Sequence, residues 1–256
     1  MTGLTVLLPP SETKREGGDP ERSLDLRALS FPELATERAA VITAARSVSS
    51  AESTARAALK LGPRSVAERL RNLVLHESPT MPAIERYTGV LYDPLDVPAA
   101  DATTRAWWAE HVVVQSAMFG PVGAADPVPA YRLSHDSRLP GLRLATHWPA
   151  PAGAALTGRT GGLVLDLRSE GYRALGPVEG AVVLRVVSVT ADGRRKALNH
   201  WNKTAKGRLV ALLGRTGAAV SSTADLVDWA AGNGVDLERR GDAWDLVAES
   251  LEPATA

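Results

Sequence analysis

The stretch AVVLRVVSV, residues 181–189, is the clearest strand in the sequence, because five of its nine residues are valines. β-Branched side chains fit the pleated surface of a strand. The turn signal Asp192-Gly193 follows, and apolar side chains then recur at helical spacing, at Leu198, Trp201, Ala205, Leu209 and Leu212. The sequence therefore predicts a strand, a turn and a helix over residues 198–213.

Further strands and helices are expected on both sides of this unit. Short apolar runs predict strands at residues 5–8, 111–118 and 163–167, and a closing hairpin at 235–247. Helical spacing predicts one or two helices within 32–61, and helices at 101–110 and 225–231, whereas 120–162 is rich in Pro and Gly and is expected to be largely irregular. This irregular alternation predicts a mixed α/β protein with one domain over residues 1–256, in which helices flank a central mixed sheet.

Composition limits the class of protein. The chain is 45% hydrophobic and 23% charged, which is ordinary for a globular protein. The apolar run at the N-terminus is interrupted by Pro9-Pro10, and no run is long enough for a membrane helix. The chain has no cysteine, so thiolate chemistry is excluded, and a cytoplasmic location is expected.

The common enzyme signatures are missing. There is no GxxxxGK[ST] loop and no GxSxG motif, and the glycines of 158–162 precede a strand rather than follow one. The five histidines are scattered, with no metal-ligand spacing, so neither a metal nor a cofactor is expected.

The charge distribution does point to a function. The chain has 29 basic and 29 acidic residues, yet no acidic residue lies between Gly193 and Gly217. The cations of this segment are Arg194, Arg195, Lys196, Lys203, Lys206, Arg208 and Arg215. On the predicted helix, Lys203 and Lys206 share a face with Asn199 and Asn202. This face is expected to point outward, either as an ordinary solvated surface or as a strip that contacts phosphates.

Three other residues are candidates for a site because they follow predicted strands or loops. Lys14 lies on the first loop, Arg132 follows a Pro-rich loop, and Glu170 lies just past the strand at 163–167. Lys14 can act as an anion ligand, Arg132 can clamp a phosphate and Glu170 can act as an acid or base. Arg132 and Glu170 can equally form a structural ion pair.

Five blocks of sequence, taken in order, resemble the YaaA family. They are LLPPSETK (7–14), RYTGVLY (86–92), QSAMFGPV with DPVPAYRL (115–122 and 126–133), LDLRSEGY (165–172) and NHWNKTAKGR (199–208). The resemblance covers most of the chain. Two departures are a longer first loop and a separation of Lys203 from Lys206, where many family members have adjacent lysines.

The resemblance implies a cytoplasmic stress protein that binds double-stranded DNA and helps to limit peroxide- and iron-driven DNA damage. It also implies a helix-hairpin-helix-like element near Tyr87–Gly89. The residues expected to contact DNA or another anion are Arg132, Arg194, Arg195, Lys196, Asn199, Asn202, Lys203, Lys206 and Arg208.

An enzyme is the alternative. Its substrate would be a nucleobase, a DNA lesion or a small phosphorylated molecule, in a pocket lined by Lys14, Arg132, Glu170 and Lys203. Lys14, Glu170 and Lys203 are the candidate catalytic residues. A lysine whose pKa is lowered by neighbouring cations, as in the group Lys196, Lys203 and Lys206, can form a Schiff base. A convex basic strip would favour DNA binding, and a deep pocket would favour catalysis.

Overall fold

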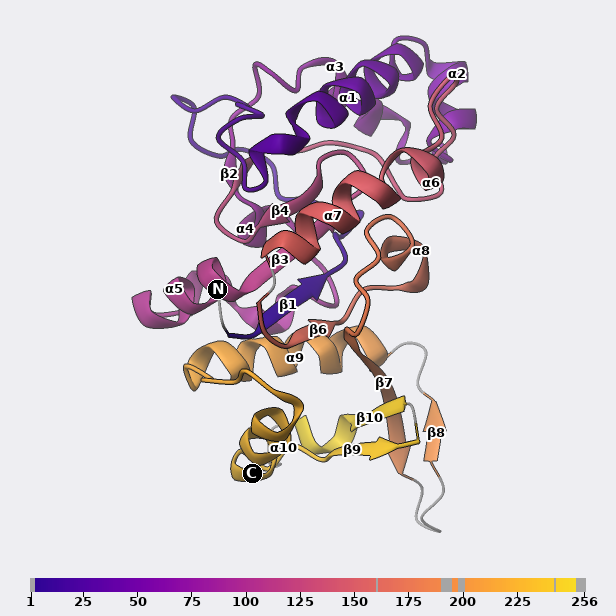
Figure 1. The fold of residues 1–256 in the computed structure, drawn as a ribbon. Coiled ribbons are helices and arrows are strands. Elements are labelled where there is room, and N and C mark those ends of the chain that lie inside the picture. The colour runs from indigo at the N-terminus through magenta and orange to yellow at the C-terminus, as the bar shows by residue number, and fades with distance from the viewer. Residues whose placement is uncertain (1–2, 160, 190–194, 198–200, 242, 252–256) are drawn as a thin grey trace.

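The computed structural model describes residues 3–159, 161–189, 195–197, 201–241 and 243–251. Its centre is a sheet in the order β4-β3-β1-β6-β7-β10-β9, with β8 paired to the far part of β7. The strands are β1 (Thr5–Leu8), β3 (Val112–Ser116), β4 (Gly120–Gly123), β6 (Val164–Asp166), β7 (Val182–Val189), β8 (Arg195–Ala197), β9 (Leu237–Arg240) and β10 (Ala243–Val247). The predicted mixed α/β fold with helices around a central sheet is confirmed (Figure 1).

The inner strands run parallel, and the antiparallel partners lie outside them. β1 pairs in parallel with β3 and β6, β6 with β7, and β7 with β10. β4, β8 and β9 pair antiparallel with β3, β7 and β10, respectively. A separate ribbon joins β2 (Met81–Pro82) to β5 (Pro127–Val128). Parallel strands are buried on both faces, and every residue of β1 and β3 is buried accordingly.

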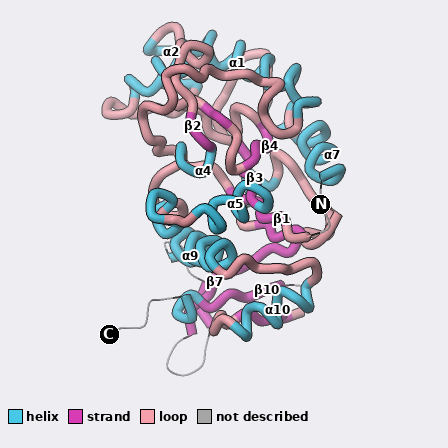
Figure 2. Tube along the Cα trace, turned by 90° about the vertical axis from the view of Figure 1, so that its left-hand side faces the viewer, coloured by secondary structure: helices cyan, strands magenta, loops and turns pink. Residues whose placement is uncertain are grey.

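Helices cover both faces of the sheet. α5 (Ala102–His111) and α9 (Trp201–Arg215) lie on one face, and α7 (Pro149–Arg159) lies on the other (Figures 1 and 2). The other helices are α1 (Ala35–Ser49), α2 (Glu52–Ala58), α3 (Arg69–Leu73), α4 (Ala83–Arg86), α6 (Leu144–His147), α8 (Glu170–Arg173) and α10 (Thr223–Gly232). Short 3₁₀ turns are η1 (Pro32–Leu34), η2 (Val66–Glu68), η3 (Asp93–Leu95), η4 (Val97–Ala99) and η5 (Ala248–Leu251).

α9 is packed on more than one side. Its Gly207 lies so close to the backbone of Leu91 that a Cβ atom there would be 2.1 Å from the Leu91 carbonyl oxygen. On the same helix, the Val210 carbonyl accepts a 3.1 Å hydrogen bond from the Trp108 indole of α5. The helix is therefore held between α5 and the segment around Leu91, as well as against the sheet.

Two arginines hold distant loops to the sheet. Arg38 of α1 donates to the carbonyl oxygens of Leu26, Ser30, Phe119 and Pro121. Arg86 of α4 donates to those of Arg15, Gly17, Pro79 and Val128. Both side chains are fully buried. Each one therefore donates to four backbone acceptors from segments that are far apart in the sequence.

No helix of the described residues is both long and apolar enough to cross a membrane.

Candidate functional site

The candidate site lies at the carboxyl ends of β1, β3 and β6. From β1 the chain moves to β3 on one side, and it later returns to β6 on the other side. The order of strands thus reverses beside β1, and ligands of open α/β sheets bind at such a point, just outside the carboxyl ends. The segments that leave these ends are the loop 9–14, Ser116 and the turn 167–170.

The first loop is fixed by the segment 87–93. The Tyr92 hydroxyl donates to the Pro9 carbonyl at 2.8 Å, and Thr13 Oγ1 donates to the Thr88 carbonyl at 3.1 Å. Gly89 has a φ of 96°, a conformation that favours glycine, and its N–H donates to the Asp93 carboxylate at 2.7 Å. Lys14 forms an isolated antiparallel bridge with Tyr87. The helix-hairpin-helix-like element expected in this segment stays a prediction.

All four tyrosines of the chain gather around this edge. Tyr87, Tyr92, Tyr131 and Tyr172 are buried, and Tyr87 packs against both Tyr92 and Tyr131. Burial raises the pKa of each hydroxyl, to about 12 for Tyr172 and well above the usual value for the other three. The hydroxyls are therefore neutral at physiological pH and can donate hydrogen bonds.

A directed chain of hydroxyl groups runs through this cluster. Ser116 Oγ lies 2.8 Å from the Tyr131 hydroxyl, which lies 2.9 Å from that of Tyr87. Ser116 Oγ also accepts hydrogen bonds from the backbone N–H groups of Met118 and Phe119. Since both of its lone pairs are then occupied, Ser116 donates to Tyr131, and Tyr131 can in turn donate to Tyr87. In that arrangement the Tyr87 hydroxyl keeps a hydrogen to donate.

Lys14 lies beside this chain in an unusual environment. Its side chain is buried, and its Nζ donates to the carbonyls of Ser11 at 2.9 Å and Glu12 at 3.3 Å. Nζ also lies 4.2 Å from the ring centroid of Tyr131. Among the described residues, no carboxylate is within ion-pair distance of it.

The pKa of Lys14 is lowered from 10.5 to about 7. Burial is the main cause, and the charges of Arg132 and Arg71 add to it, while Glu68 and Glu12 oppose it. At neutral pH a large fraction of the folded protein therefore carries an uncharged amine at this position. An uncharged lysine is a nucleophile and a base, whereas a protonated lysine is neither.

Arg132 is close to Lys14 but is already paired. Its Nη2 lies 3.1 Å from Glu12 and its Nη1 lies 3.3 Å from Glu68, and Glu68 also pairs with Arg71. The ion pair considered between Arg132 and Glu170 is therefore wrong. Arg132 shapes the charge around Lys14, and its paired guanidinium is less suited to clamp a phosphate.

The basic segment is not one outward strip. Lys206 is buried, and its Nζ donates to the carbonyl of Leu167 at 3.2 Å, just past β6. Burial lowers the pKa of Lys206 to about 8; Asp166 opposes the shift and Arg173 adds to it. The expectation that Lys206 points outward beside Lys203 is thus wrong, because α9 is packed on that side as well.

The other predicted contact residues differ in exposure. Lys196 on β8 and Lys203 on α9 are exposed, and Asn202 and Arg208 are half-buried. Arg195 belongs to β8 by its backbone. Arg194 and Asn199 lie outside the described residues. Among the side chains of these two elements that the structure describes, the exposed cations are Lys196, Lys203 and Arg215.

Glu170 is exposed at the start of α8 and lines a cavity of about 360 Å³ together with Asp166, Arg168 and Arg173. Lys14 and Arg132 are neighbours, whereas Lys203 is on the surface of α9. None of five cavities in the described part of the chain is lined by Lys14, Arg132 or Lys203, and Glu170 lines one of them without the other three.

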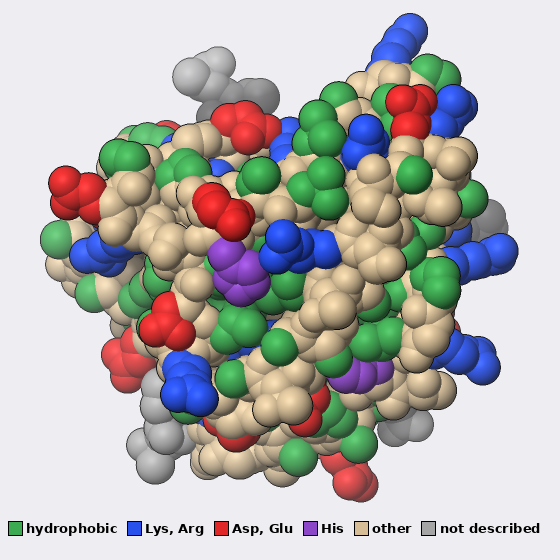
Figure 3. Space-filling model, turned by 90° about the horizontal axis from the view of Figure 1, so that it is seen from above, with side chains coloured by type: hydrophobic (Ala, Val, Ile, Leu, Met, Phe, Trp, Pro, Cys, Tyr) green, Lys and Arg blue, Asp and Glu red, His purple; other side chains and the backbone are tan. Residues whose placement is uncertain are grey.

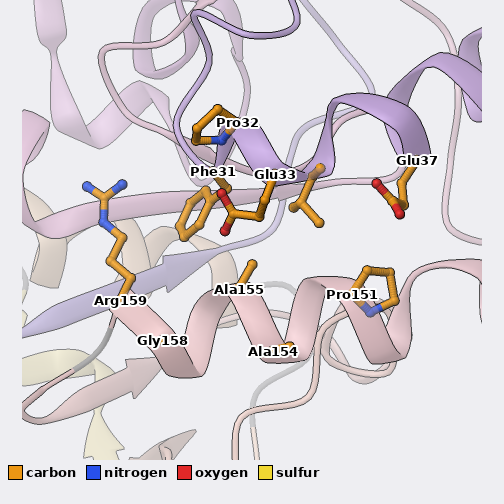
Figure 4. Close-up of a pocket in the computed structure, with 10 residues that line it drawn as sticks. Phe31, Pro32, Glu33, Glu37, Pro151, Ala154, Ala155, Gly158 and Arg159 are labelled. Carbon is orange, nitrogen blue, oxygen red and sulfur yellow. The ribbon is translucent and has the colours of Figure 1, made fainter.

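A larger cavity lies elsewhere. A groove of about 600 Å³ lies between α7 and the η1–α1 segment. Figure 4 shows Glu33, Glu37 and Arg159 among the residues that line it. Arg159 stacks on the Phe31 ring at 5.0 Å, and the carboxylates of Glu33 and Glu37 outnumber this one cation in the lining of the groove. The end of the molecule that carries α1–α3 shows interspersed acidic and basic side chains (Figure 3). Neither surface suits a polyanion.

The sequence analysis placed Tyr131 and Tyr172 where sites often form, but it assigned no role to any tyrosine, and it missed Ser116 and Arg71. A signal for the tyrosines was present, because each of them lies in one of the blocks 86–92, 126–133 and 165–172. Within the described residues, no three His, Asp or Glu side chains gather in a way that could hold a metal ion.

Comparison with known proteins places the chain in a family. The family model for peroxide stress protein YaaA matches residues 4–233. A UPF0246 protein of Corynebacterium efficiens is 43% identical over 242 residues, which cover 92% of this chain and 95% of the relative. A UPF0246 protein of Streptomyces coelicolor is 38% identical over 247 residues, 94% of each chain. This chain therefore belongs to the peroxide stress protein YaaA family.

Proposed function

We propose that the protein binds duplex DNA next to the carboxyl edge of its sheet and so helps to limit peroxide- and iron-driven DNA damage in the cytoplasm. The observation that carries the proposal is the position of the start of α9. Lys206 ties this part of the helix to Leu167, immediately past β6, and Lys203 is exposed less than one turn before it. The family's link to peroxide stress supports the cellular role.

The two lysines have separate tasks in this proposal. Lys206 fixes the helix to the sheet, while Lys203 has no ion-pair partner among the described residues and is free to contact a phosphate. The N-terminal end of a helix also carries a partial positive charge, which favours an anion there. Lys196 on β8 adds a second exposed cation.

Fluorescence anisotropy with a labelled duplex over a salt series tests the DNA contacts. Each lost phosphate contact lowers the slope of log K against log salt by about 1, so Lys196→Ala/Lys203→Ala is expected to lower it by about 2. Arg143→Ala removes an exposed cation from the N-terminal end of α6 and is the matched control. Absence of binding at low salt, or the wild-type slope in the double variant, rejects the proposal.

A second function, an enzyme that uses Lys14 as a nucleophile, is favoured by the lowered pKa of this residue and by its lack of a carboxylate partner. The uncharged amine would attack a carbonyl carbon of a nucleobase, a DNA lesion or a small phosphorylated aldehyde. A C–N bond forms, the carbonyl oxygen leaves as water, and a Schiff base remains. The hydrogen on Tyr87, at the end of the hydroxyl chain, is a donor for the departing oxygen.

Trapping with borohydride distinguishes this function from simple DNA binding. Duplex DNA with an abasic site and glyceraldehyde 3-phosphate serve as the two carbonyl probes. Wild type and Lys60→Arg are expected to form a reduced adduct, which peptide mapping locates at Lys14, whereas Lys14→Arg forms none. An equal yield in Lys14→Arg would show that the amine of Lys14 is not the nucleophile.

A further inference from the structure

The cavity beside α8 has features of a binding site that neither proposed function uses. It lies between the carboxyl end of β6, helix α8 and the start of β7, and its polar walls are Asp166, Arg168, Glu170 and Arg173. Pro177 and Val178 form part of its apolar wall. With a volume of about 360 Å³, it can hold a group of the size of a phosphorylated sugar.

One of the two arginines is fully engaged. Arg168 donates to both carboxylate oxygens of Asp166, at 2.9 and 2.6 Å, and both residues are buried. Its Nη1 lies 3.3 Å from Gln115 Oε1 at the end of β3. This pair has no net charge, and its bidentate geometry makes it a rigid wall of the cavity.

Arg173 is different, because its guanidinium has no acceptor among the described residues. Its Nε is buried away from water and unpaired, a state that destabilises the protein unless an acceptor binds there. The charged Lys206 amine lies near enough that Arg173 affects its protonation. An unpaired guanidinium on the wall of the cavity, beside an arginine–aspartate pair without net charge, calls for an acceptor with negative charge.

We propose that this cavity binds an oxyanion, the phosphate of a phosphate monoester, with Arg173 as its main ligand. The fork of an arginine matches two phosphate oxygens. Glu170 carries a negative charge on the wall of the cavity and limits the affinity. The site is separate from the DNA contacts of Lys196 and Lys203, and it does not need the amine of Lys14.

The phosphate monoester can come from a free nucleotide or from the 5′ end of a DNA strand. Calorimetric titration at low salt with inorganic phosphate, thymidine 5′-monophosphate and thymidine tests the shared chemistry. Binding of the first two, and not of thymidine, is expected. A 5′-phosphorylated duplex compared with its unphosphorylated form then separates the sources, since only a DNA end that reaches the cavity gains affinity from its phosphate.

Substitutions of the residues that line the cavity test whether phosphate binds there. Arg173→Gln is expected to weaken phosphate binding by about tenfold or more, because a hydrogen bond to a charged group is lost. Arg173→Lys keeps the positive charge but loses the guanidinium fork, so its affinity for phosphate should lie between those of wild type and Arg173→Gln. Glu170→Gln should bind phosphate more tightly than wild type. Arg143→Gln is the control and should bind as wild type does.

Equal affinity of wild type and Arg173→Gln for phosphate would overturn the proposal, as would absence of phosphate binding by the folded wild type. A variant that loses phosphate binding but keeps the wild-type salt dependence on an unphosphorylated duplex would support this cavity and leave the DNA proposal standing. Circular dichroism of each variant shows that a loss of binding is not a loss of fold.

Discussion

Two regions of the protein bury cations with different numbers of hydrogen-bond acceptors. Arg38 and Arg86 are fully buried, and each donates to four backbone carbonyls of loops that are far apart in the sequence. Burial lowers the pKa of each to about 10, so both stay charged at neutral pH. Lys14 has only two carbonyl acceptors and the face of Tyr131, and its pKa is about 7.

The difference separates a structural cation from a reactive one. Full coordination compensates for lost hydration and leaves the arginines chemically inert. Partial coordination leaves the charged form of Lys14 destabilised, so the group changes its protonation state near neutral pH. A buried cation that has few acceptors and lies at the carboxyl edge of a parallel sheet therefore indicates a functional site more strongly than a buried cation that is fully coordinated.

The largest expected effect comes from removing a structural arginine. Arg86→Met leaves four carbonyl acceptors without their donor and is expected to lower the free energy of unfolding by about 3–5 kcal/mol. Urea denaturation measures this, with Arg143→Met as an exposed control that should change it by less than about 0.5 kcal/mol. A loss below about 1 kcal/mol for Arg86→Met would mean that the coordination does not stabilise the loops.

The next effect is the pH dependence caused by Lys14. Its folded pKa of about 7 lies below its unfolded value of 10.5. Between these values the unfolded chain binds a proton that the folded protein lacks, so the free energy of unfolding rises with pH. From pH 7 to about pH 9 the rise due to Lys14 is expected to be about 2 kcal/mol. Lys206, whose pKa is lowered to about 8, is expected to raise the free energy of unfolding in the same way from about pH 8 upward.

Lys14→Met isolates this contribution. Its free energy of unfolding, measured in urea at a series of pH values, should rise less than that of wild type between pH 7 and 9. At pH 7 the variant should be as stable as wild type or more so, since it lacks a poorly coordinated charge. Parallel pH curves for the two proteins would show that Lys14 is not the titrating group.

A smaller effect is expected from the hydroxyl chain. Tyr131→Phe keeps the ring under Lys14 but removes the acceptor of Ser116 and the donor to Tyr87, and should cost about 1–2 kcal/mol of unfolding free energy. Tyr92→Phe removes one hydroxyl that binds the Pro9 carbonyl and is the matched comparison. If borohydride trapping at Lys14 is as fast in Tyr131→Phe as in wild type, the hydroxyl groups of Ser116, Tyr131 and Tyr87 do not deliver the proton to the departing oxygen.

The smallest effect on stability belongs to Lys203→Ala. The side chain is exposed, so the free energy of unfolding should change by less than about 0.5 kcal/mol while DNA affinity falls. Lys206→Met should instead keep the salt slope of DNA binding close to that of wild type, because this amine faces Leu167. A slope that falls equally in both variants would contradict the division of roles between the two lysines.

The four inner strands β1, β3, β6 and β7 could be predicted because each is a local apolar run, whereas β4 and β5 lie in the segment 120–162, which was expected to be largely irregular. β1, β3, β6 and β7 lie within one to two residues of the expected ranges, and the closing hairpin is present as β9 and β10. α7 was missed, since Pro149 and Pro151 in its first turn were taken for irregular structure, although proline is tolerated there.

The candidate site was harder to predict because its parts are distant in the sequence. The interpretation of Lys206 assumed a helix with one buried face, whereas α9 is buried on several sides, with Gly207 against Leu91. Nothing near Lys14 in the sequence indicates that Tyr131 will lie under its amine or that Arg71 and Arg132 will be its neighbours. Those contacts depend on the tertiary fold.

The place of β10 in the sheet has a consequence for how the chain acquires its structure. β10 lies between β7 and β9, although it is made after both during translation. Until residues 243–247 have left the ribosome, the hydrogen-bonding edge of β7 that receives them is open. An open apolar edge can pair with another chain. Premature termination before β10 would therefore yield a chain prone to aggregation, rather than a shortened protein with a working site.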